Sequence, residues 1–282
     1  MLFFCFGGSM FLDELIRKSL EEDIGTGDIT TKYLDLEPIN STAFIVAKAD
    51  GVLAGAEVAR SVFKMVDPEL KITLYRKDGD KLRPKDEIMR LEGRPGSILQ
   101  GERTALNFMQ RMSGIATKTA QLVALIGKTD TKLLDTRKTT PMLRTLEKYS
   151  VRIGGGFNHR FGLFDMVLIK ENHIRACGSI TSAVQRIRNH NTTYKIEVEV
   201  TNMAELDEAF NAGVDRVMLD NMKPAEIKAA VKKYKKRMEF EVSGGITEEN
   251  ILAYAKTGVQ YISSGALTHS YKSLDISLLF KE

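Results

Sequence analysis

Positively charged side chains that can bind anions are concentrated between Lys132 and Arg175. This segment holds nine Lys or Arg residues against four Asp or Glu residues, a local charge of +5, so the rest of a chain that carries +4 sums to about −1. Arginine pairs with a carboxylate through two parallel hydrogen bonds, and several cations in one pocket suit a ligand with more than one anionic group. The candidate cations are Arg137, Lys138, Arg160 and Lys170, with His159 beside them.

Two carboxylates and two small-residue turns further along the chain suit a different ligand. Glu199 and Asp220 can coordinate Mg²⁺ through oxygen, although an exposed pair of carboxylates is the alternative interpretation. The turns consist of Ser243, Gly244 and Gly245 and of Ser264, Gly265 and Ala266. Such turns expose backbone N–H groups to a phosphate, although SGG alone can be a tight turn without a ligand. Together, these groups predict transfer of a phosphorylated sugar onto an acidic acceptor.

All of these groups except His159 and Arg160 lie at the end of a short β-rich run. The runs are KLLDTRK, DMVLIKEN, KIEVEV, DRVMLDN, EFEVSGG and YISSGA, and amphipathic helical stretches separate most of them. This alternation predicts parallel strands in βαβ units, whose carboxyl ends meet at one face. The last three ends, near Asp220, Ser243 and Gly265, are 23 and 22 residues apart. That spacing suits a βα barrel, although six runs fall short of eight.

The amino-terminal half follows a different pattern. Apolar residues recur at helical spacing from Phe11, and short β-rich runs over residues 40–95 predict a small antiparallel sheet. From Gly101 a long amphipathic stretch predicts one helix or a pair of helices, with Gly114 as a possible break.

Composition excludes several classes of protein. With 43% hydrophobic and 28% charged residues among 282, the chain reads as an ordinary soluble globular protein. No run of 18 apolar residues is present, so no membrane-spanning helix is predicted. Cys5 and Cys177 have no disulfide-type or zinc-type spacing, which favours the cytoplasm. The basic segment carries no aromatic ladder, which argues against nucleic acid. Residues 1–9 are too short for a signal peptide and are expected to form a disordered or extra tail.

Several segments closely resemble the quinolinate phosphoribosyltransferase family, also called nicotinate-nucleotide pyrophosphorylase (carboxylating). The segments are EDIGTGDITT, GERTALNFMQRMSGIAT, LDTRKTT, GGGFNHR, KENHI, IEVEV, VMLDN, EVSGGI and ISSGALTHS. The resemblance runs from about Phe11 to the carboxyl terminus, and DTRKT followed by GGGFNHR and KENH is its most specific part.

The resemblance implies a fold, an assembly and a reaction. The fold is α/β: an N-terminal α/β sandwich domain over residues 10–113, joined by the C-terminal segment 269–282, and an incomplete α/β (TIM-like) barrel over residues 114–268. The family forms homodimers with shared active sites, which can assemble further. Its members convert quinolinate and phosphoribosyl pyrophosphate (PRPP) into nicotinate mononucleotide, pyrophosphate and CO₂ with Mg²⁺, in de novo NAD biosynthesis.

The resemblance also implies residue roles. Arg103 is expected to reach the partner's site, and the other quinolinate-binding residues are Thr136, Arg137, Lys138, His159, Arg160 and Lys170. Glu199, Asp220 and the two turns are expected to bind PRPP, with Mg²⁺ held by the two carboxylates directly or through PRPP or water. The expected catalytic residues are Lys138, Glu199 and Asp220. His173 and His269 are expected beside the site.

Three alternative functions remain open at the level of sequence. A relative with other specificity, such as a molybdenum-transport-associated homologue or a phosphoribosyltransferase for a monocarboxylate, would leave some of the cations unpaired. A barrel aldolase would use Lys170 as a Schiff-base nucleophile. A regulator that binds a phosphorylated metabolite would use the turns but gives no reason for Glu199 and Asp220 together.

Overall fold

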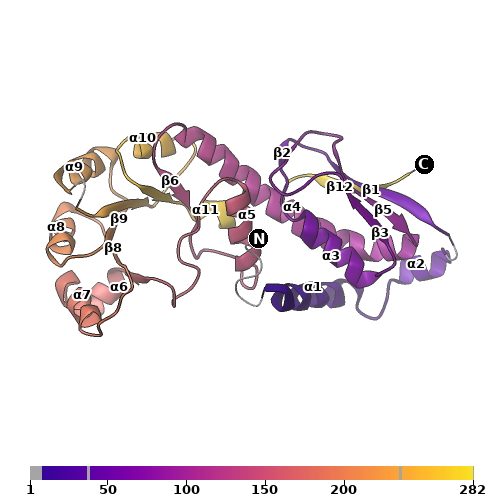
Figure 1. Cartoon of the computed structure of the whole chain (residues 1–282), viewed down its shortest axis with the longest axis horizontal. Helices are drawn as coiled ribbons and strands as arrows, with labels where there is room; N and C mark the ends of the chain where they lie inside the picture. Colours follow the sequence, from indigo (N-terminus) through magenta and orange to yellow (C-terminus); the bar gives the residue numbers. More distant parts are fainter. Residues whose placement is uncertain (1–7, 37–38, 235–236, 282) are drawn as a thin grey trace. The chain divides into compact units, whose positions relative to one another are not determined.

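A computed structural model describes residues 8–36, 39–234 and 237–281 and divides the chain into two compact units (Figure 1). Unit 1 takes in the chain up to Lys118, Pro141–Gly154 and the segment from Tyr271 onward, and unit 2 takes in Thr119–Thr140 and Gly155–Ser270. Of the tail expected over residues 1–9, residues 1–7 lie outside the described residues. Gly8 and Ser9 begin the first helix, α1 (Gly8–Ile24).

Unit 1 contains the expected antiparallel sheet, with strand order β12-β1-β5-β3. Its strands are β1 (Ser41–Ala47), β3 (Lys71–Leu74), β5 (Glu87–Gly93) and β12 (Ile276–Phe280), and a separate pair is formed by β2 (Gly51–Val52) and β4 (Lys81–Leu82). The carboxyl-terminal strand β12 pairs with β1, with Ile45 opposite Leu278. This pairing joins the end of the chain to the sheet formed by residues 41–93.

Unit 1 also contains helices α1, α2 (Ile29–Leu34), α3 (Ala56–Val66) and α5 (Arg144–Ile153), together with the part of α4 (Pro95–Ile126) up to Lys118. The apolar residues of α3 recur every three or four positions, which places Ala59, Val62 and Phe63 on one fully buried face. That face packs into a core with strand residues Ile45, Met89 and Leu91. The core therefore forms between the helices and the sheet.

Helix α4 (Pro95–Ile126) is continuous through Gly114, so the break suggested by the sequence at Gly114 is wrong. A Cβ atom at this position would overlap the main-chain carbonyl of Lys272. Glycine is needed here for the close approach of the carboxyl-terminal segment. Two hydrogen bonds hold that segment: Leu274 N–H donates to the Gln110 carbonyl at 3.0 Å, and Gln110 Nε2 donates to the Ile276 carbonyl at 2.7 Å.

Residues 141–154 belong to unit 1, whereas the expected boundaries place them in the barrel. They include helix α5 (Arg144–Ile153), whose Leu146 joins the core of unit 1. Its fully buried Glu147 forms an ion pair with Arg111 of α4, and the Tyr149 hydroxyl donates to Asp78 at 2.8 Å. An apolar side chain and two polar contacts therefore attach this segment to unit 1.

Unit 2 contains six parallel strands in the order β6-β11-β10-β9-β8-β7. They are β6 (Lys132–Leu134), β7 (Val167–Ile169), β8 (Ile196–Val200), β9 (Arg216–Asp220), β10 (Glu239–Ser243) and β11 (Tyr261–Ser263). The six expected runs all form strands. Among the described residues, β6 and β7 are the two edge strands of this sheet, which confirms an incomplete barrel. Leu134 also makes an isolated parallel bridge to Phe157.

Unit 2 contains helices α6 (Glu171–Cys177), α7 (Ile180–Arg188), α8 (Met203–Asn211), α9 (Pro224–Tyr234), α10 (Ile251–Ala255) and α11 (Ala266–His269). Helices α6 to α10 connect strands β7 to β11 of unit 2 in chain order and lie along the outside of the sheet, and α11 follows β11 (Figure 1). Parallel pairing brings the carboxyl ends of the strands to one edge, where Ser243 lies opposite Asp220. The chain after each strand therefore reaches the same edge.

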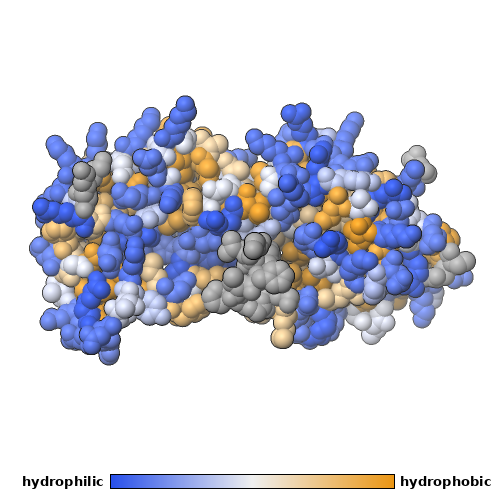
Figure 2. Space-filling view, viewed as in Figure 1, coloured by the Kyte–Doolittle hydropathy of each residue, from blue (hydrophilic) through white to orange (hydrophobic). Residues whose placement is uncertain are grey.

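The visible face of the molecule is largely hydrophilic, with hydrophobic residues in scattered patches (Figure 2). Among the described residues, no helix has the length and apolar character required to cross a membrane.

Candidate active site

A cavity of about 720 Å³ lies at the carboxyl ends of the strands of unit 2. Its lining includes every binding or catalytic residue that the sequence predicts except Arg103, and of the two histidines expected beside the site it does not include His173. The predicted binding and catalytic residues in the lining are Thr136, Arg137, Lys138, His159, Arg160, Lys170, Glu199, Asp220, Ser243, Gly244, Gly245, Ser264, Gly265 and Ala266. His269 also lines the cavity.

Two arginines, Arg137 and Arg160, line the cavity within electrostatic reach of each other. Burial and the nearby charge of Arg137 lower the pKa of Arg160. Arg160 donates to the Met166 carbonyl at 3.2 Å, and the buried Nε of Arg137 has no hydrogen-bond partner among the described residues. Two half-buried guanidinium groups that disfavour each other's charge suit an anionic ligand.

Another part of the cavity holds the carboxylates of Glu199 and Asp220, with Lys170 and Lys138 within electrostatic reach of Asp220. Lys170 Nζ forms an ion pair with Glu199 Oε2 at 2.8 Å. Burial and the charge of Glu199 raise the pKa of Asp220, against the opposing effect of the Asn221 amide that donates to Asp220 at 2.7 Å. Two carboxylates within electrostatic reach of each other offer oxygen ligands to a divalent cation.

The two glycine-containing turns pack tightly around the cavity. Gly244 has φ of +92°, and a Cβ atom there would overlap the Asn221 side chain. A Cβ at Gly265 would lie 2.8 Å from the Lys138 side chain. The Thr268 hydroxyl also donates to the Lys138 carbonyl at 2.7 Å. The backbone of both turns therefore comes closer to its neighbours than a residue with a side chain allows.

His159 is in the cavity wall, but its ring nitrogens contact other groups of the protein. Nε2 lies 3.1 Å from Glu197 and 3.4 Å from Glu241. Both carboxylates are buried, with 1% and 0% of their surface exposed. Nδ1 accepts the backbone N–H of Arg160 at 2.7 Å. The neutral imidazole in this arrangement carries its proton on Nε2, where it faces the carboxylates, and a second proton, on Nδ1, would displace the Arg160 N–H.

Electrostatics link this histidine to its carboxylates. Burial lowers the pKa of His159, but hydrogen bonds to Glu197 and Glu241 outweigh that effect and raise the pKa to about 9. Burial raises the pKa of Glu197. The ligating atoms of the three residues lie within 4.8 Å of one another, close enough for a metal ion. The Arg216 guanidinium lies 3.5 Å from Glu241, and the imidazole contacts both carboxylates. Because these groups can balance the charge of the carboxylates, we assign the cluster to ion pairing.

Sequence reasoning missed Glu197, Glu241 and Asn221. A signal for the two glutamates was available, because IEVEV and EFEVS alternate Glu with apolar residues. In a strand, alternate side chains share one face, so Glu197 follows the same face as Glu199. No comparable pattern marks Asn221, which is in the loop after β9 and has φ of +54°.

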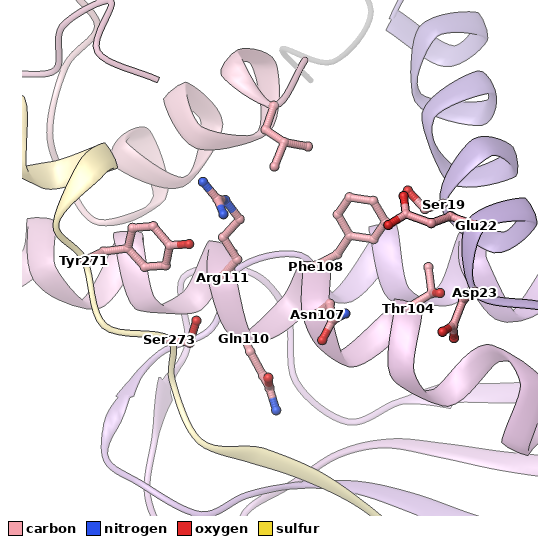
Figure 3. Close-up of a pocket in the computed structure, with 11 residues that line it drawn as sticks. Ser19, Glu22, Asp23, Thr104, Asn107, Phe108, Gln110, Arg111, Tyr271 and Ser273 are labelled. Carbon is pink, nitrogen blue, oxygen red and sulfur yellow. The ribbon is translucent and has the colours of Figure 1, made fainter. Parts of the chain in front are cut away.

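Arg103 belongs to unit 1, where its side chain is exposed on α4. A second cavity, of about 420 Å³, is also in unit 1 (Figure 3). Residues from α1 and α4 line it, together with Leu143, Tyr271 and Ser273. The Arg111 guanidinium lies 4.9 Å from the centre of the Tyr271 ring on one side of this cavity.

Comparison with known proteins gives consistent matches over nearly the whole chain. The family model described as quinolinate phosphoribosyl transferase, N-terminal domain, matches residues 28–113, and the corresponding C-terminal domain matches residues 115–279. The chain is 46% identical over 268 residues to a probable nicotinate-nucleotide pyrophosphorylase (carboxylating) of Bacillus subtilis, covering 95% of this chain and 92% of the relative.

Solved structures agree with these matches. The structure of the nicotinate-nucleotide pyrophosphorylase from Francisella tularensis has a TM-score of 0.91 and 46% identity, covering 96% of each chain. A crystal structure from Streptococcus pyogenes has a TM-score of 0.92 and 40% identity, covering 97% of this chain and 98% of that one.

Proposed function

Because this chain belongs to the quinolinate phosphoribosyl transferase family, we propose that it transfers the phosphoribosyl group of PRPP to quinolinate. The reaction releases pyrophosphate and CO₂ and forms nicotinate mononucleotide, a step of NAD synthesis. The observation that carries the proposal is the division of one cavity into a part with two close arginines and a part with two carboxylates. A dicarboxylate suits the first part, and a metal-bound sugar phosphate suits the second.

Arg137 and Arg160 would bind the two carboxylates of quinolinate, with Lys138 and Lys170 adding positive charge. A monocarboxylate would leave part of this charge unpaired in a half-buried site. Holding the ring in this way directs its nitrogen toward the sugar carbon. Such orientation can lower a barrier substantially, by about 7 to 11 kcal/mol at the limit.

Glu199 and Asp220 would hold Mg²⁺, directly or through water or PRPP. The raised pKa of Asp220 fits this role, because a cation would favour its ionised form. When bound, the ion neutralises charge on the departing pyrophosphate. The two carboxylates would stabilise the positive charge that develops at the ribosyl carbon. The two glycine-containing turns would bind phosphate through their backbone N–H groups.

Lys138 would provide a cation beside the carboxylate that leaves. Ribosylation makes the ring nitrogen cationic, so it can stabilise the electron pair that remains at the adjacent ring carbon when CO₂ departs. That carbon then takes up a proton. This sequence requires no covalent intermediate with the protein, and Lys170 already donates to Glu199 at 2.8 Å.

The protein would act as a homodimer in which Arg103 enters the partner's site. Light scattering would measure the mass of the assembly and show whether dimers associate further. The support is that Arg103 is exposed on α4 and belongs to a different unit from the cavity residues. We also propose a cytoplasmic location, supported by the absence of a disulfide-type spacing between the two cysteines.

The decisive experiment incubates the protein with PRPP, Mg²⁺ and quinolinate that is labelled in the carboxylate next to the ring nitrogen. Labelled CO₂ and nicotinate mononucleotide are expected in equal amounts. If neither product forms, the proposal is rejected. Nucleotide formation from a monocarboxylate in preference to quinolinate would favour the relative with other specificity. Borohydride trapping of a substrate on Lys170 would favour the aldolase, and binding without turnover would favour the regulator.

A further inference from the structure

The segment that carries His159 and Arg160 has no helix or strand of its own, yet buried carboxylates hold it at several points. Asp135 is fully buried and accepts the backbone N–H of His159 at 2.9 Å. It also accepts the side-chain amide of Asn158. Glu197 and Glu241 hold the imidazole from the barrel interior.

These two glutamates are costly for the fold. Glu197 Oε1 and Glu241 Oε1 have no hydrogen-bond partner among the described residues. A buried carboxylate destabilises a fold unless its oxygens are paired, and an apolar replacement is often neutral or stabilising. Barrel interiors are usually filled by branched aliphatic side chains. Two charged residues in the barrel interior destabilise the fold, which indicates that their role is not stability.

A chain of contacts leads from these carboxylates to the cavity. They hold Nε2 of His159, and Nδ1 of the same ring accepts the backbone N–H of Arg160. This bond restrains the main chain of Arg160, whose guanidinium lines the cavity close to Arg137. Two like charges repel each other, so an external restraint is needed to keep them close.

We propose that Glu197 and Glu241 are positioning residues that act through His159 to hold the Arg160 guanidinium beside Arg137. The two arginines, held in this way, set the affinity of the cavity for the dicarboxylate substrate. This inference rests on the proposed function for the identity of that substrate. The glutamates cannot bind the substrate by direct attraction, because their carboxylates repel the carboxylates of the substrate.

The test compares Glu241→Gln with Glu239→Gln. Both side chains follow the same face of β10, and both contact Arg216. Of these two residues, Glu241 contacts His159 and lines the cavity, whereas Glu239 is not part of the cavity lining. Glutamine keeps the size of the side chain but removes the charge, which makes Glu239→Gln a matched control.

For Glu241→Gln we expect the KM and Kd of quinolinate to rise about tenfold, because a charged hydrogen bond is worth roughly that factor or more. The KM of PRPP should stay within about twofold, since the substitution leaves Glu199 and Asp220 unchanged. Glu239→Gln should leave both KM values within about twofold. Equal losses for both substrates, or an unchanged affinity for quinolinate, would overturn the inference.

A double-mutant cycle tests whether the effect passes through His159. In a His159→Gln background, Glu241→Gln should change the Kd of quinolinate by less than about twofold, because the contact that it acts through is already lost. A further tenfold loss would show an independent effect and overturn the inference.

Two controls separate failure of the inference from other failures. If Glu241→Gln does not fold, Glu197→Gln takes its place with the same expected and contrary results. If the unmodified protein does not bind quinolinate in the same calorimetric titration, the proposed function fails. If it binds quinolinate but the variants bind equally well, only the positioning inference fails.

Discussion

Arg137 and Arg160 share a half-buried part of the cavity, where each charge disfavours the other. The repulsion destabilises the protein without ligand, and a bound anion relieves it. Such a site therefore favours binding of an anion. Residues of this kind contribute to binding and little to folding. The same reasoning separates them from Glu147, whose buried charge is paired with Arg111 within the fold.

We therefore predict that Arg137→Met has a large effect on binding and a small one on stability. The Kd of quinolinate should rise by about 100-fold because a charge-assisted bidentate contact is lost. The free energy of unfolding should fall by no more than about 1 kcal/mol, since the substitution removes a like-charge repulsion. Calorimetric titration and urea unfolding measure the two quantities.

Lys228→Met provides the control, because Lys228 is an exposed cation of α9 outside the cavity lining. It should leave both quantities unchanged. A large loss of stability in Arg137→Met with unchanged binding would contradict this interpretation of the arginine pair.

His159 should make stability depend on pH. Its pKa is raised from 6.5 to about 9 in the folded protein, so the folded state binds a proton that the unfolded state releases at lower pH. The resulting stabilisation is fully present below pH 6.5 and is lost as pH rises through 9. Its upper size is about 3 kcal/mol, and the Arg160 N–H at Nδ1 reduces it.

Urea unfolding at several values between pH 6 and pH 10 measures this effect. The difference in unfolding free energy between the unmodified protein and His159→Gln should shrink as pH rises. A difference that is constant across this range, or that grows with pH, would show that the carboxylates do not keep the imidazole protonated.

At the scale of elements, Gly114 shows how a close contact overrides helix propensity. Alanine favours an exposed helix by about 1 kcal/mol relative to glycine. At this position, however, its Cβ would overlap the Lys272 carbonyl and displace the segment that precedes β12.

Gly114→Ala should therefore lower the free energy of unfolding by about 2 kcal/mol or more, through strain in a packed region. Asn107→Ala, at an exposed position of the same helix, should change it by less than about 0.5 kcal/mol. Urea unfolding of the two variants gives the comparison. Stabilisation by Gly114→Ala would mean that the carboxyl-terminal segment is free to move away from α4.

At the scale of the whole molecule, the fold divides the basic segment between two units. Arg144, Lys148 and Arg152 are on α5 in unit 1, and Arg137, Lys138, Arg160 and Lys170 line the cavity of unit 2. The local excess of positive charge is therefore only partly a property of the anion site. The cavity itself also contains Glu199 and Asp220, so its net charge is smaller than the sequence segment suggests.

The assembly proposed above predicts complementation between two inactive proteins. Arg103→Ala and Lys138→Ala should each lose most activity alone. Mixed dimers should recover activity at one of two sites, because that site combines an intact Arg103 with an intact Lys138. Activity is measured after subunit exchange has been verified with differently tagged chains. Verified exchange without recovery would contradict shared sites.

By itself, the sequence predicted the six parallel strands, the antiparallel sheet and most of the residues that line the cavity, although it missed Glu241 and Asn221. These features follow from local periodicity and from the rule that parallel strands direct their carboxyl ends to one edge. Only the tertiary structure decided that residues 141–154 join unit 1, that α4 continues through Gly114, and that His159 contacts Glu197, 38 residues away. These features depend on contacts between distant segments, and local spacing carries no information about which distant segment will fill a given space.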